Sequence, residues 1–416
     1  MLSLYLTINI VKKLCYNGTV NRKGESVMER ENRRDIYGKG DGRYYVLMAL
    51  LESRKKSRED RKKEKREFYE FWDSKGMTWT GSSVSSSILG FIIGDALGVP
   101  VEFVGRDNLK NNPITDMEEY GTHYQPKGTW SDDTSMVLAT MKGIINDDHL
   151  SLDYKKIMNN FLLWKDKAQF TPFNKVFDIG NATSYALSVY QQHIYDNDAD
   201  NVICGTGEIS SNGNGSLMRI MPIVLYLERA NIDYIDEKFF EIIKTVSSMT
   251  HSHIYSIFGC YIYSAYMTEL LRGTDKLEAY QILQKHLQEL VKNNDEFSEV
   301  KKVYSRVING DLLNLKEKEI NSSGYVVDSL EAALWSVLTS NSFEESVLKA
   351  INLGEDTDTI GALTGCLAGL IYGEYKIPEK WINALQEKDY LEQSIEEFED
   401  YLELVQIDRL KKELNL

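Results

Sequence analysis

The sequence predicts an all-α protein with a single compact helical domain. Apolar residues recur at helical spacing over long stretches, and the alternation of apolar and polar residues that is typical of strands is scarce. The chain contains only six prolines, and its glycines concentrate in a few short motifs. We therefore expect one domain with functional loops between its helices, rather than internal repeats or two domains.

The helical domain is expected to span residues 81–416 and to begin with a helix over residues 82–98. Serines between residues 82 and 86 offer helix N-caps, and Ile88, Ile92 and Leu97 follow at helical spacing. Similar apolar patterns predict further helices, in chain order, over residues 136–145, 154–164, 239–248, 254–271, 279–291, 329–338, 343–352 and 360–372.

The last of these predicted helices carries a glycine stripe. Gly361, Gly365 and Gly369 lie four residues apart, so one side of the helix is bare. In lipid such a stripe would be an association motif, but this apolar run is too short to cross a membrane. We therefore predict a buried helix that lets its neighbours approach closely.

Residues 1–80 are predicted to form a charged extension before the domain. They hold 19 lysines and arginines against 12 acidic residues, a net charge of +7, which leaves −22 for the rest of a chain whose total is −15. The mixed-charge run 54–66 has no sustained apolar face, so we expect a solvated helix or a disordered tail. The alternatives are an extension that folds back on the acidic domain or binds an acidic protein partner, and translation that begins near Met77.

The composition and charge of the chain also limit which binding partners and which cellular compartment we expect. A net charge of −15 over 416 residues argues against nucleic acid as a partner. No apolar run approaches the roughly 20 residues of a membrane helix, and the apolar stretch 2–11 has its lysines after it, which is the wrong polarity for a secretory signal. The four cysteines have neither metal-type nor disulfide-framework spacing, at Cys15, Cys204, Cys260 and Cys366. We expect a cytoplasmic protein.

Two motifs crowd carboxylates and hydroxyls into a few residues: Ser131-Asp132-Asp133-Thr134 and Gly354-Glu355-Asp356-Thr357-Asp358-Thr359. Carboxylates packed this closely repel one another unless a cation neutralises them, and oxygen ligands suit Mg²⁺ or Mn²⁺. The plainer interpretation is two helix N-caps, but each motif has more acid than a cap needs. In the second motif, a regular helix would turn the two aspartates apart by about 200°, so a non-helical turn must bring them together.

The chain resembles the ADP-ribosylglycohydrolase family. The matching segments span about residues 82–390 in the family's order: Gly94-Asp95-Ala96-Leu97-Gly98-Val99-Pro100-Val101-Glu102-Phe103, Gly128-Thr129-Trp130-Ser131-Asp132-Asp133-Thr134, Phe177-Asp178-Ile179-Gly180-Asn181-Ala182-Thr183, Asn212-Gly213-Asn214-Gly215-Ser216-Leu217-Met218-Arg219, Thr250-His251-Ser252-His253, Ser323-Gly324-Tyr325-Val326-Val327-Asp328 and the 354–359 motif. The resemblance implies a compact helical domain with a binuclear metal cleft.

The resemblance also implies roles for individual residues. Two Mg²⁺ or Mn²⁺ ions are expected on Ser131, Asp132, Asp133, Asp356, Asp358 and Thr359. The catalytic residues are expected to be Glu102, Asp133 and Asp178, where Glu102 is a mobile glutamate that can act as a base and Asp178 acts at the ribose. The substrate-binding residues are expected to be Asn181, Asn212, Gly213, Asn214, Gly215, Ser216, His251 and Tyr325.

Each role has a plainer alternative. Glu102 would be a surface carboxylate on a loop, and Asp178 a helix cap. The 212–216 loop would be only a turn, although its backbone N–H groups can cradle a pyrophosphate. His251 would be a buried, satisfied histidine and Tyr325 a core tyrosine, rather than a ring that stacks on adenine or ribose. Glu355 adds an acid where relatives often carry a small residue, which is tolerable if it faces solvent.

The function that the resemblance implies is hydrolysis of an N- or O-glycosidic bond, with release of ADP-ribose from a modified protein or a small molecule. A carboxylate would deprotonate the attacking water. One alternative is a protein of the same fold that binds ADP-ribose or a partner, as immunity-type relatives do. The other is a Mg²⁺-dependent phosphatase or nucleoside hydrolase, which also fits acidic oxygen ligands.

Overall fold

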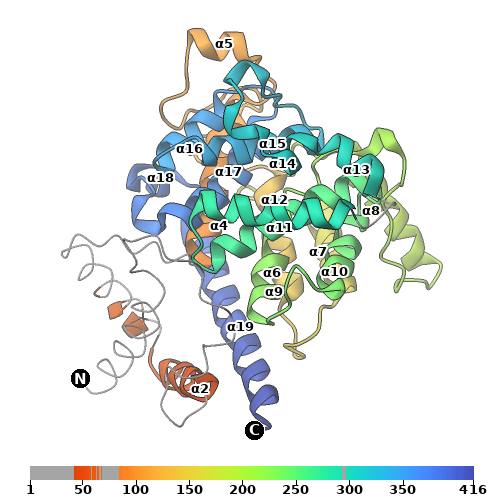
Figure 1. Ribbon diagram of the computed structural model, residues 1–416, viewed down its shortest axis with the longest axis vertical. Coiled ribbons are helices and arrows are strands. Elements are labelled where there is room, and N and C mark those ends of the chain that lie inside the picture. Colours follow the sequence, from red (N-terminus) through yellow and green to blue (C-terminus); the bar gives the residue numbers. More distant parts are fainter. Residues whose placement is uncertain (1–41, 58, 62, 65–66, 68–83, 293–296) are drawn as a thin grey trace. The chain divides into compact units, whose positions relative to one another are not determined.

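A computed structural model describes residues 42–57, 59–61, 63–64, 67, 84–292 and 297–416. The chain divides into two compact units, Met1–Thr78 with Glu403–Leu416, and Trp79–Leu402. Every regular element in the described residues is a helix, apart from two isolated β-bridges. The predicted all-α class is therefore confirmed (Figure 1).

The larger unit holds most of the helices. Its longer elements, in chain order, are α4 (Val84–Gly98), α6 (Asp132–Ile144), α7 (Tyr154–Lys167), α8 (Asn181–Tyr195), α9 (Met221–Arg229), α10 (Glu237–Ser248), α11 (Ile254–Leu271), α12 (Lys276–Lys292), α15 (Val326–Leu338), α16 (Phe343–Ile351) and α17 (Thr357–Tyr372). Shorter elements are η2 (Val99–Val101), α5 (Arg106–Asn111), η3 (Ile209–Ser211), α13 (Ser298–Val303), α14 (Ser305–Asn309), η5 (Asp311–Asn314), η6 (Glu317–Glu319), η7 (Glu374–Lys376) and α18 (Glu379–Ala384). Each helix predicted from the apolar pattern is present.

Helices α4 and α17 pack antiparallel with their backbones in contact. A Cβ atom on Gly94 would lie 2.0 Å from the carbonyl oxygen of Gly361, and one on Gly90 would lie 2.2 Å from that of Gly365. Almost every residue of both helices is buried. The predicted glycine stripe is confirmed, because only glycine permits this approach of two backbones.

This pairing places the two ends that carry the acidic residues beside each other. The hydroxyl of Thr357, in the first turn of α17, donates to the carbonyl oxygen of Gly98 at the end of α4 (2.8 Å). The chain leaves α4 through η2 and reaches Glu102. Just beyond, the N–H of Phe103 donates to the carbonyl oxygen of Glu355 (2.6 Å). Glu102 and the 354–359 motif therefore meet although they lie far apart in the sequence.

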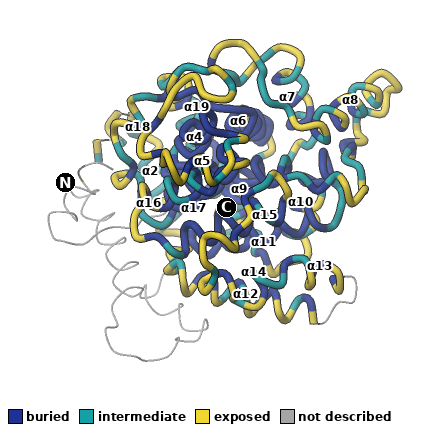
Figure 2. Tube along the Cα trace, turned by 90° about the horizontal axis from the view of Figure 1, so that it is seen from above, coloured by how far each residue is buried: buried dark blue, intermediate teal, exposed yellow. Residues whose placement is uncertain are grey.

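Asp95 of α4 fixes the start of α6. Its carboxylate accepts hydrogen bonds from the N–H groups of Ser131 and Thr134 (both 3.0 Å) and from the Thr134 hydroxyl (2.5 Å). These bonds satisfy N–H groups that have no partner within the helix. The first acidic motif is thus held against α4, and Figure 2 shows both α4 and α6 as buried helices.

One helical stretch in the described residues, Val84–Val101, is long and apolar enough to cross a membrane by composition alone. It is 94% buried inside the protein, as expected for a core helix that packs against α17. The expectation that no apolar run has membrane length is thereby corrected for this stretch.

The smaller unit is described only in part. Its helix α2 (Gly42–Ser53) buries Leu47 against Ile407 and Leu410 in the C-terminal part of α19 (Lys388–Leu414). Arg54 and Arg61 lie 3.6 and 3.3 Å from the carboxylate of Glu403. Residues 1–41 and Met77 lie outside the described residues, and the division into an extension 1–80 and a domain 81–416 stays a prediction.

Candidate active site

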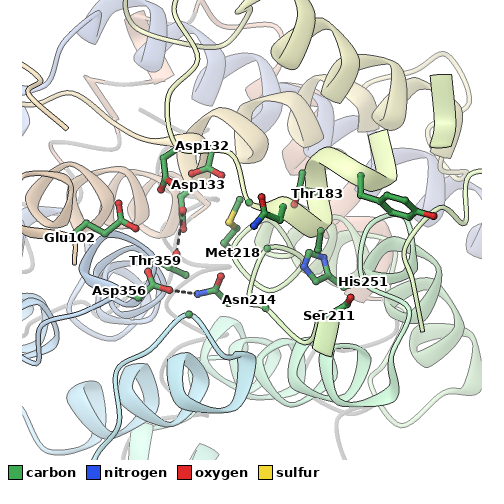
Figure 3. Close-up of a pocket in the computed structure, with 18 of the residues that line it drawn as sticks. Glu102, Asp132, Asp133, Thr183, Ser211, Asn214, Met218, His251, Asp356 and Thr359 are labelled. Carbon is green, nitrogen blue, oxygen red and sulfur yellow. Dashed lines mark hydrogen bonds between the residues drawn. The ribbon is translucent and has the colours of Figure 1, made fainter. Parts of the chain in front are cut away.

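A cavity of about 500 Å³ is lined by most of the residues for which the sequence predicted a catalytic, substrate-binding or metal-binding role. From the predicted set it is lined by Glu102, Asp132, Asp133, Asp178, Asn181, Gly213, Asn214, Gly215, His251, Asp356 and Thr359. Figure 3 shows the carboxylates of Glu102, Asp132, Asp133 and Asp356 toward one end and His251 toward the other, with Asn214 bonded to Asp356.

At the acidic end, a hydroxyl group joins the two acidic motifs, and the amide of Asn214 bonds to the second motif. The hydroxyl of Thr359 donates to Oδ2 of Asp133 (3.3 Å), and the side-chain amide of Asn214 donates to Oδ2 of Asp356 (2.6 Å) (Figure 3). The other carboxylate oxygen of Asp133, Oδ1, is buried without a hydrogen-bond partner. A buried carboxylate oxygen normally has a partner, so Oδ1 is an open ligand position.

The local backbone explains how each motif presents its acids. Ser131 is the N-cap of α6, and its hydroxyl accepts from the N–H of Asp133 (3.1 Å). Asp356 occupies the N-cap position of α17, but its side chain makes no cap hydrogen bond. The plain N-cap interpretation therefore holds for Ser131 and fails for Asp356. The predicted non-helical backbone is found at the first aspartate, because Asp356 has φ −91° and ψ 75°, whereas Thr357 and Asp358 already belong to α17.

Burial and mutual repulsion raise the pKa values of these carboxyl groups. Burial is the largest cause for Asp132, Asp133 and Asp358, whose pKa values lie well above the usual range, and neighbouring carboxylates raise them further. Burial also raises the pKa of Asp95 to about 6. Such a cluster is costly when ionised, and a bound cation would offset that cost.

In the part of the chain that the structure describes, two groups of side chains have the spacing of cation ligands. One ligand atom each from Glu102, Asp356 and Asp358 lies within 4.8 Å of the others. A second group joins Glu102 with Asp178 and His123. With the open oxygen of Asp133, these clusters fit a site for hard divalent cations.

Glu102 is buried, so its interpretation as a surface carboxylate is wrong. Its Oε2 contacts Nε2 of His123, and burial raises its pKa to about 7 despite this contact. The His123 ring lies close to those of Phe103 and Phe177, at centroid distances of 5.9 and 5.2 Å. A catalytic role for Glu102 stays a prediction.

Asp178 lies in the loop before α8, with a φ angle of +52°. The N-cap of α8 is Gly180, so Asp178 is not the helix cap of the plainer interpretation. Asn181 is the first residue of α8 and lines the cavity. The end of the loop and the start of α8 thus present both Asp178 and Asn181 to the cavity.

At the end of the cavity away from the carboxylates, His251 contacts the loop that contains Gly213 and Gly215. A Cβ atom on Gly215 would lie 2.9 Å from Cε1 of His251 and 3.0 Å from the hydroxyl of Thr183. Burial, followed by the charge of Arg219, lowers the pKa of His251 to about 3, so its ring is neutral at physiological pH. His251 is therefore both a buried histidine and part of the cavity wall.

Comparison with known proteins identifies the family of this chain. The family model described as ADP-ribosylglycohydrolase matches residues 80–410. The chain belongs to the ADP-ribosylglycohydrolase family. It is 30% identical over 320 residues to the ADP-ribosylarginine hydrolase Tri1 of Pseudomonas putida (strain GB-1), in a match that covers 76% of this chain and 77% of the relative. It is 25% identical over 322 residues to the ADP-ribosyl-[dinitrogen reductase] glycohydrolase of Rhodospirillum rubrum, covering 74% and 93%.

A solved structure shows the same fold. The chain matches an "ADP-ribosylglycohydrolase-related protein complex" with a TM-score of 0.60 and 26% identity, over 79% of this chain and 99% of that one. The predicted resemblance is confirmed, and with it the assignment to a family whose relatives include hydrolases.

Some residues that the family resemblance suggested do not line the cavity: Ser131, Asn212, Ser216, Tyr325 and Asp358. Asn212 ties its loop to α11, because its Oδ1 accepts from the N–H (3.2 Å) and the hydroxyl (3.0 Å) of Ser256. Ser216 is fully buried and accepts from the hydroxyl of Ser247 (3.0 Å). Both hold the loop in place, and Tyr325 pairs with Gly213 in an isolated bridge.

Other cavity residues were not singled out from the sequence: Phe103, Thr183, Tyr185, Thr206, Ser210, Ser211 and Met218, with His123 beside Glu102. Phe103, Thr183 and Met218 lie inside the matching segments but were given no role there, and no residue-type pattern marks the others. Glu355, the additional acid, is exposed to solvent and does not line this cavity.

Proposed function

We propose that the protein is a metal-dependent hydrolase that removes ADP-ribose from an arginine side chain by cleaving the N-glycosidic bond. The observation that carries this proposal is one cavity that has both a carboxylate end and a neutral, glycine-rich end. Among the described residues that line it there is no lysine or arginine. A cationic guanidinium leaving group suits such surroundings, and similar proteins are ADP-ribosylarginine hydrolases.

Two Mg²⁺ or Mn²⁺ ions are proposed as cofactors, held by Asp132, Asp133, Asp356, Asp358, Ser131 and Thr359. The open Oδ1 of Asp133 and the raised pKa values of the buried aspartates support this choice. When bound, the ions neutralise the carboxylates and act as a Lewis acid toward ribose hydroxyls.

The chain's own groups are assigned as follows. Glu102, which is buried in the cavity wall, takes a proton from the attacking water. Water adds to the anomeric carbon as the bond to the guanidino nitrogen breaks. The guanidinium leaves with the bonding electron pair as a neutral guanidine, which then takes up the proton that the water has lost. Asp178 and Asn181 face the ribose. The N–H groups of Gly213 and Gly215 hold the diphosphate, because that of Asn214 donates to the carbonyl oxygen of Gly324 (3.0 Å).

The acceptor is tested with a panel of substrates. Release of ADP-ribose is measured with an arginine-linked substrate and a serine-linked substrate, and hydrolysis is measured with a nucleoside and a phosphate monoester. The proposal predicts turnover of the arginine-linked substrate at a kcat/KM at least about tenfold above the others. Preference for the serine-linked compound would overturn the acceptor alone, and hydrolysis of only the nucleoside or phosphate ester would overturn the reaction.

A binding protein of the same fold would release nothing while still binding ADP-ribose in calorimetry. We also propose a cytoplasmic location. The described cysteines Cys204, Cys260 and Cys366 carry free thiols, which is compatible with a reducing compartment.

A further inference from the structure

A fully buried arginine lies behind the neutral end of the cavity. Nη2 of Arg219 donates to the carbonyl oxygen of Val246 (3.0 Å) and to Oγ1 of Thr250 (2.7 Å). Its guanidinium carbon lies 4.8 Å from the centre of the Phe161 ring. Among the ion pairs of the described residues none includes Arg219. Its Nη2 bonds to neutral groups, whereas its Nε and Nη1 are buried without a hydrogen-bond partner.

A further contact links Thr250 to His251, which lies in the cavity wall. Oγ1 of Thr250 lies 2.8 Å from Nδ1 of His251. Thr250 has no exposed surface and His251 is only 2% exposed. The three side chains therefore form a buried hydrogen-bonded row. The row ends at the imidazole of His251, which lines the cavity (Figure 3).

The hydrogen-bond donors and acceptors of Arg219, Thr250 and His251 allow only one placement of the protons between them. A guanidinium only donates, so Oγ1 of Thr250 must accept from Arg219. The hydroxyl proton of Thr250 then needs an acceptor, and Nδ1 of His251 is the acceptor within reach. If Nδ1 carried a proton, two donors would point at Oγ1 and the buried hydroxyl proton would have no partner, which is unfavourable. Nδ1 is thus the acceptor, and the ring proton resides on Nε2.

Nε2 is the nitrogen on the side of the glycine loop. It lies 3.6 Å from the position that a Cβ atom would take on Gly213. We propose that Arg219 and Thr250 are positioning residues that fix His251 as its Nε2–H tautomer, so that it presents a neutral donor to an oxygen of the bound nucleotide. The ligand assignment rests on the proposed function, whereas the tautomer is a property of the protein alone.

A neutral donor has a specific advantage at this place. An imidazolium would be attracted to the carboxylates at the other end of the same cavity and would hold an anionic product more tightly. Burial and the positive charge of Arg219 both lower the pKa of His251 and so disfavour that form. The fixed tautomer recognises an oxygen acceptor by hydrogen bonding without adding a charge to the site.

The tautomer is measured directly in the wild-type protein. The full chain is labelled with ¹⁵N-histidine, and the ring nitrogens are observed by long-range ¹H–¹⁵N NMR without ligand at neutral pH. His251 is assigned by comparison with His251→Gln. The inference predicts a protonated Nε2 and an unprotonated Nδ1. A protonated Nδ1 would overturn it, whether or not the protein hydrolyses any substrate.

Variants test the positioning role. Thr250→Val keeps the shape and removes the hydroxyl, so His251 should lose its preference for Nε2–H and ADP-ribose should bind roughly tenfold more weakly in calorimetry. Thr250→Ser should restore both. The matched control is Thr268→Val, which removes a buried hydroxyl that donates to the carbonyl oxygen of Ser264 (2.8 Å), away from His251. An unchanged tautomer and affinity in folded Thr250→Val would contradict the proposal.

Discussion

Gly94 and Gly361 face each other across α4 and α17 with no room for a side chain on either residue. A Cβ atom on Gly94 would lie only 2.0 Å from the Gly361 carbonyl oxygen, and one on Gly361 would lie 2.5 Å from that of Gly94. Both helices adjoin the acidic end of the cavity, at Glu102 and at Asp356. The stability of this helix pair and the geometry of the site should therefore change together.

Gly94→Ala tests this coupling. The added methyl group meets backbone rather than a movable side chain, so we expect a loss of about 3 kcal/mol or more in the free energy of unfolding. Urea unfolding measures it, and activity should fall as well. Gly105→Ala is the control, because a Cβ atom there has nothing within 4 Å and should change stability by less than about 0.5 kcal/mol. Equal midpoints for the two variants would contradict the packing argument.

The metal-free protein should lose stability as the pH rises from about 5 to about 8. The pKa values of Asp95 and Glu102 are raised to about 6 and about 7, so the folded state holds these protons more tightly than the unfolded state. Stability from this source is complete below the unfolded pKa values of about 4 and is lost as the pH passes through the folded values of about 6 to 7.

Added Mg²⁺ should oppose this loss. We expect the rise in melting temperature on Mg²⁺ addition to be larger at about pH 8 than at about pH 5, because ionised carboxylates bind the cation. Thermal melts in EDTA and in Mg²⁺ at both pH values decide the point. A melting temperature indifferent to Mg²⁺ and to EDTA at the higher pH would refute the metal site.

Asp133→Asn removes one charge from the buried cluster and keeps its shape. Turnover should fall by at least about 10²-fold, and Mg²⁺ should no longer raise the melting temperature. Without metal, the variant should be at least as stable as wild type, because a carboxylate that its neighbours repel is gone. Asp107→Asn, whose side chain is 99% exposed, is the control for a lost surface charge. A fully active Asp133→Asn protein would mean that this aspartate holds no cation.

Glu102→Gln and Asp178→Asn separate chemistry from binding. If Glu102 is the base and Asp178 faces the ribose, kcat should fall by roughly 10²-fold or more while ADP-ribose still binds. Steady-state rates beside isothermal titration test both variants. Unchanged kcat in the two variants would show that the catalytic carboxylates lie elsewhere.

The sequence predicted those parts of the molecule that depend on local pattern. The period of the apolar residues located most of the longer helices, and the spacing of Gly361, Gly365 and Gly369 predicted the close helix contact. The crowding of acids at 131–134 and 354–359 indicated that both motifs serve one site. Helix α19 was not predicted because much of its sequence is charged.

The parts that the sequence could not predict depend on tertiary contacts. His123 reaches Glu102 only because the loop between α5 and α6 folds back toward the cavity, and no local pattern records that path. Similarly, the 212–216 motif does not reveal which side chains point inward. Asn214 and the glycines line the cavity, whereas Asn212 and Ser216 hold the loop from behind.

The most direct test of the account is release of ADP-ribose from an arginine-linked substrate by the full-length protein after removal of metal and its return. Wild-type protein treated with EDTA and dialysed should be inactive, and Mg²⁺ or Mn²⁺ should restore release of free ADP-ribose, detected by mass spectrometry. Equal release with and without metal would contradict the metal-dependent mechanism. No release under any condition, with ADP-ribose still bound, would make the protein a binding member of its family.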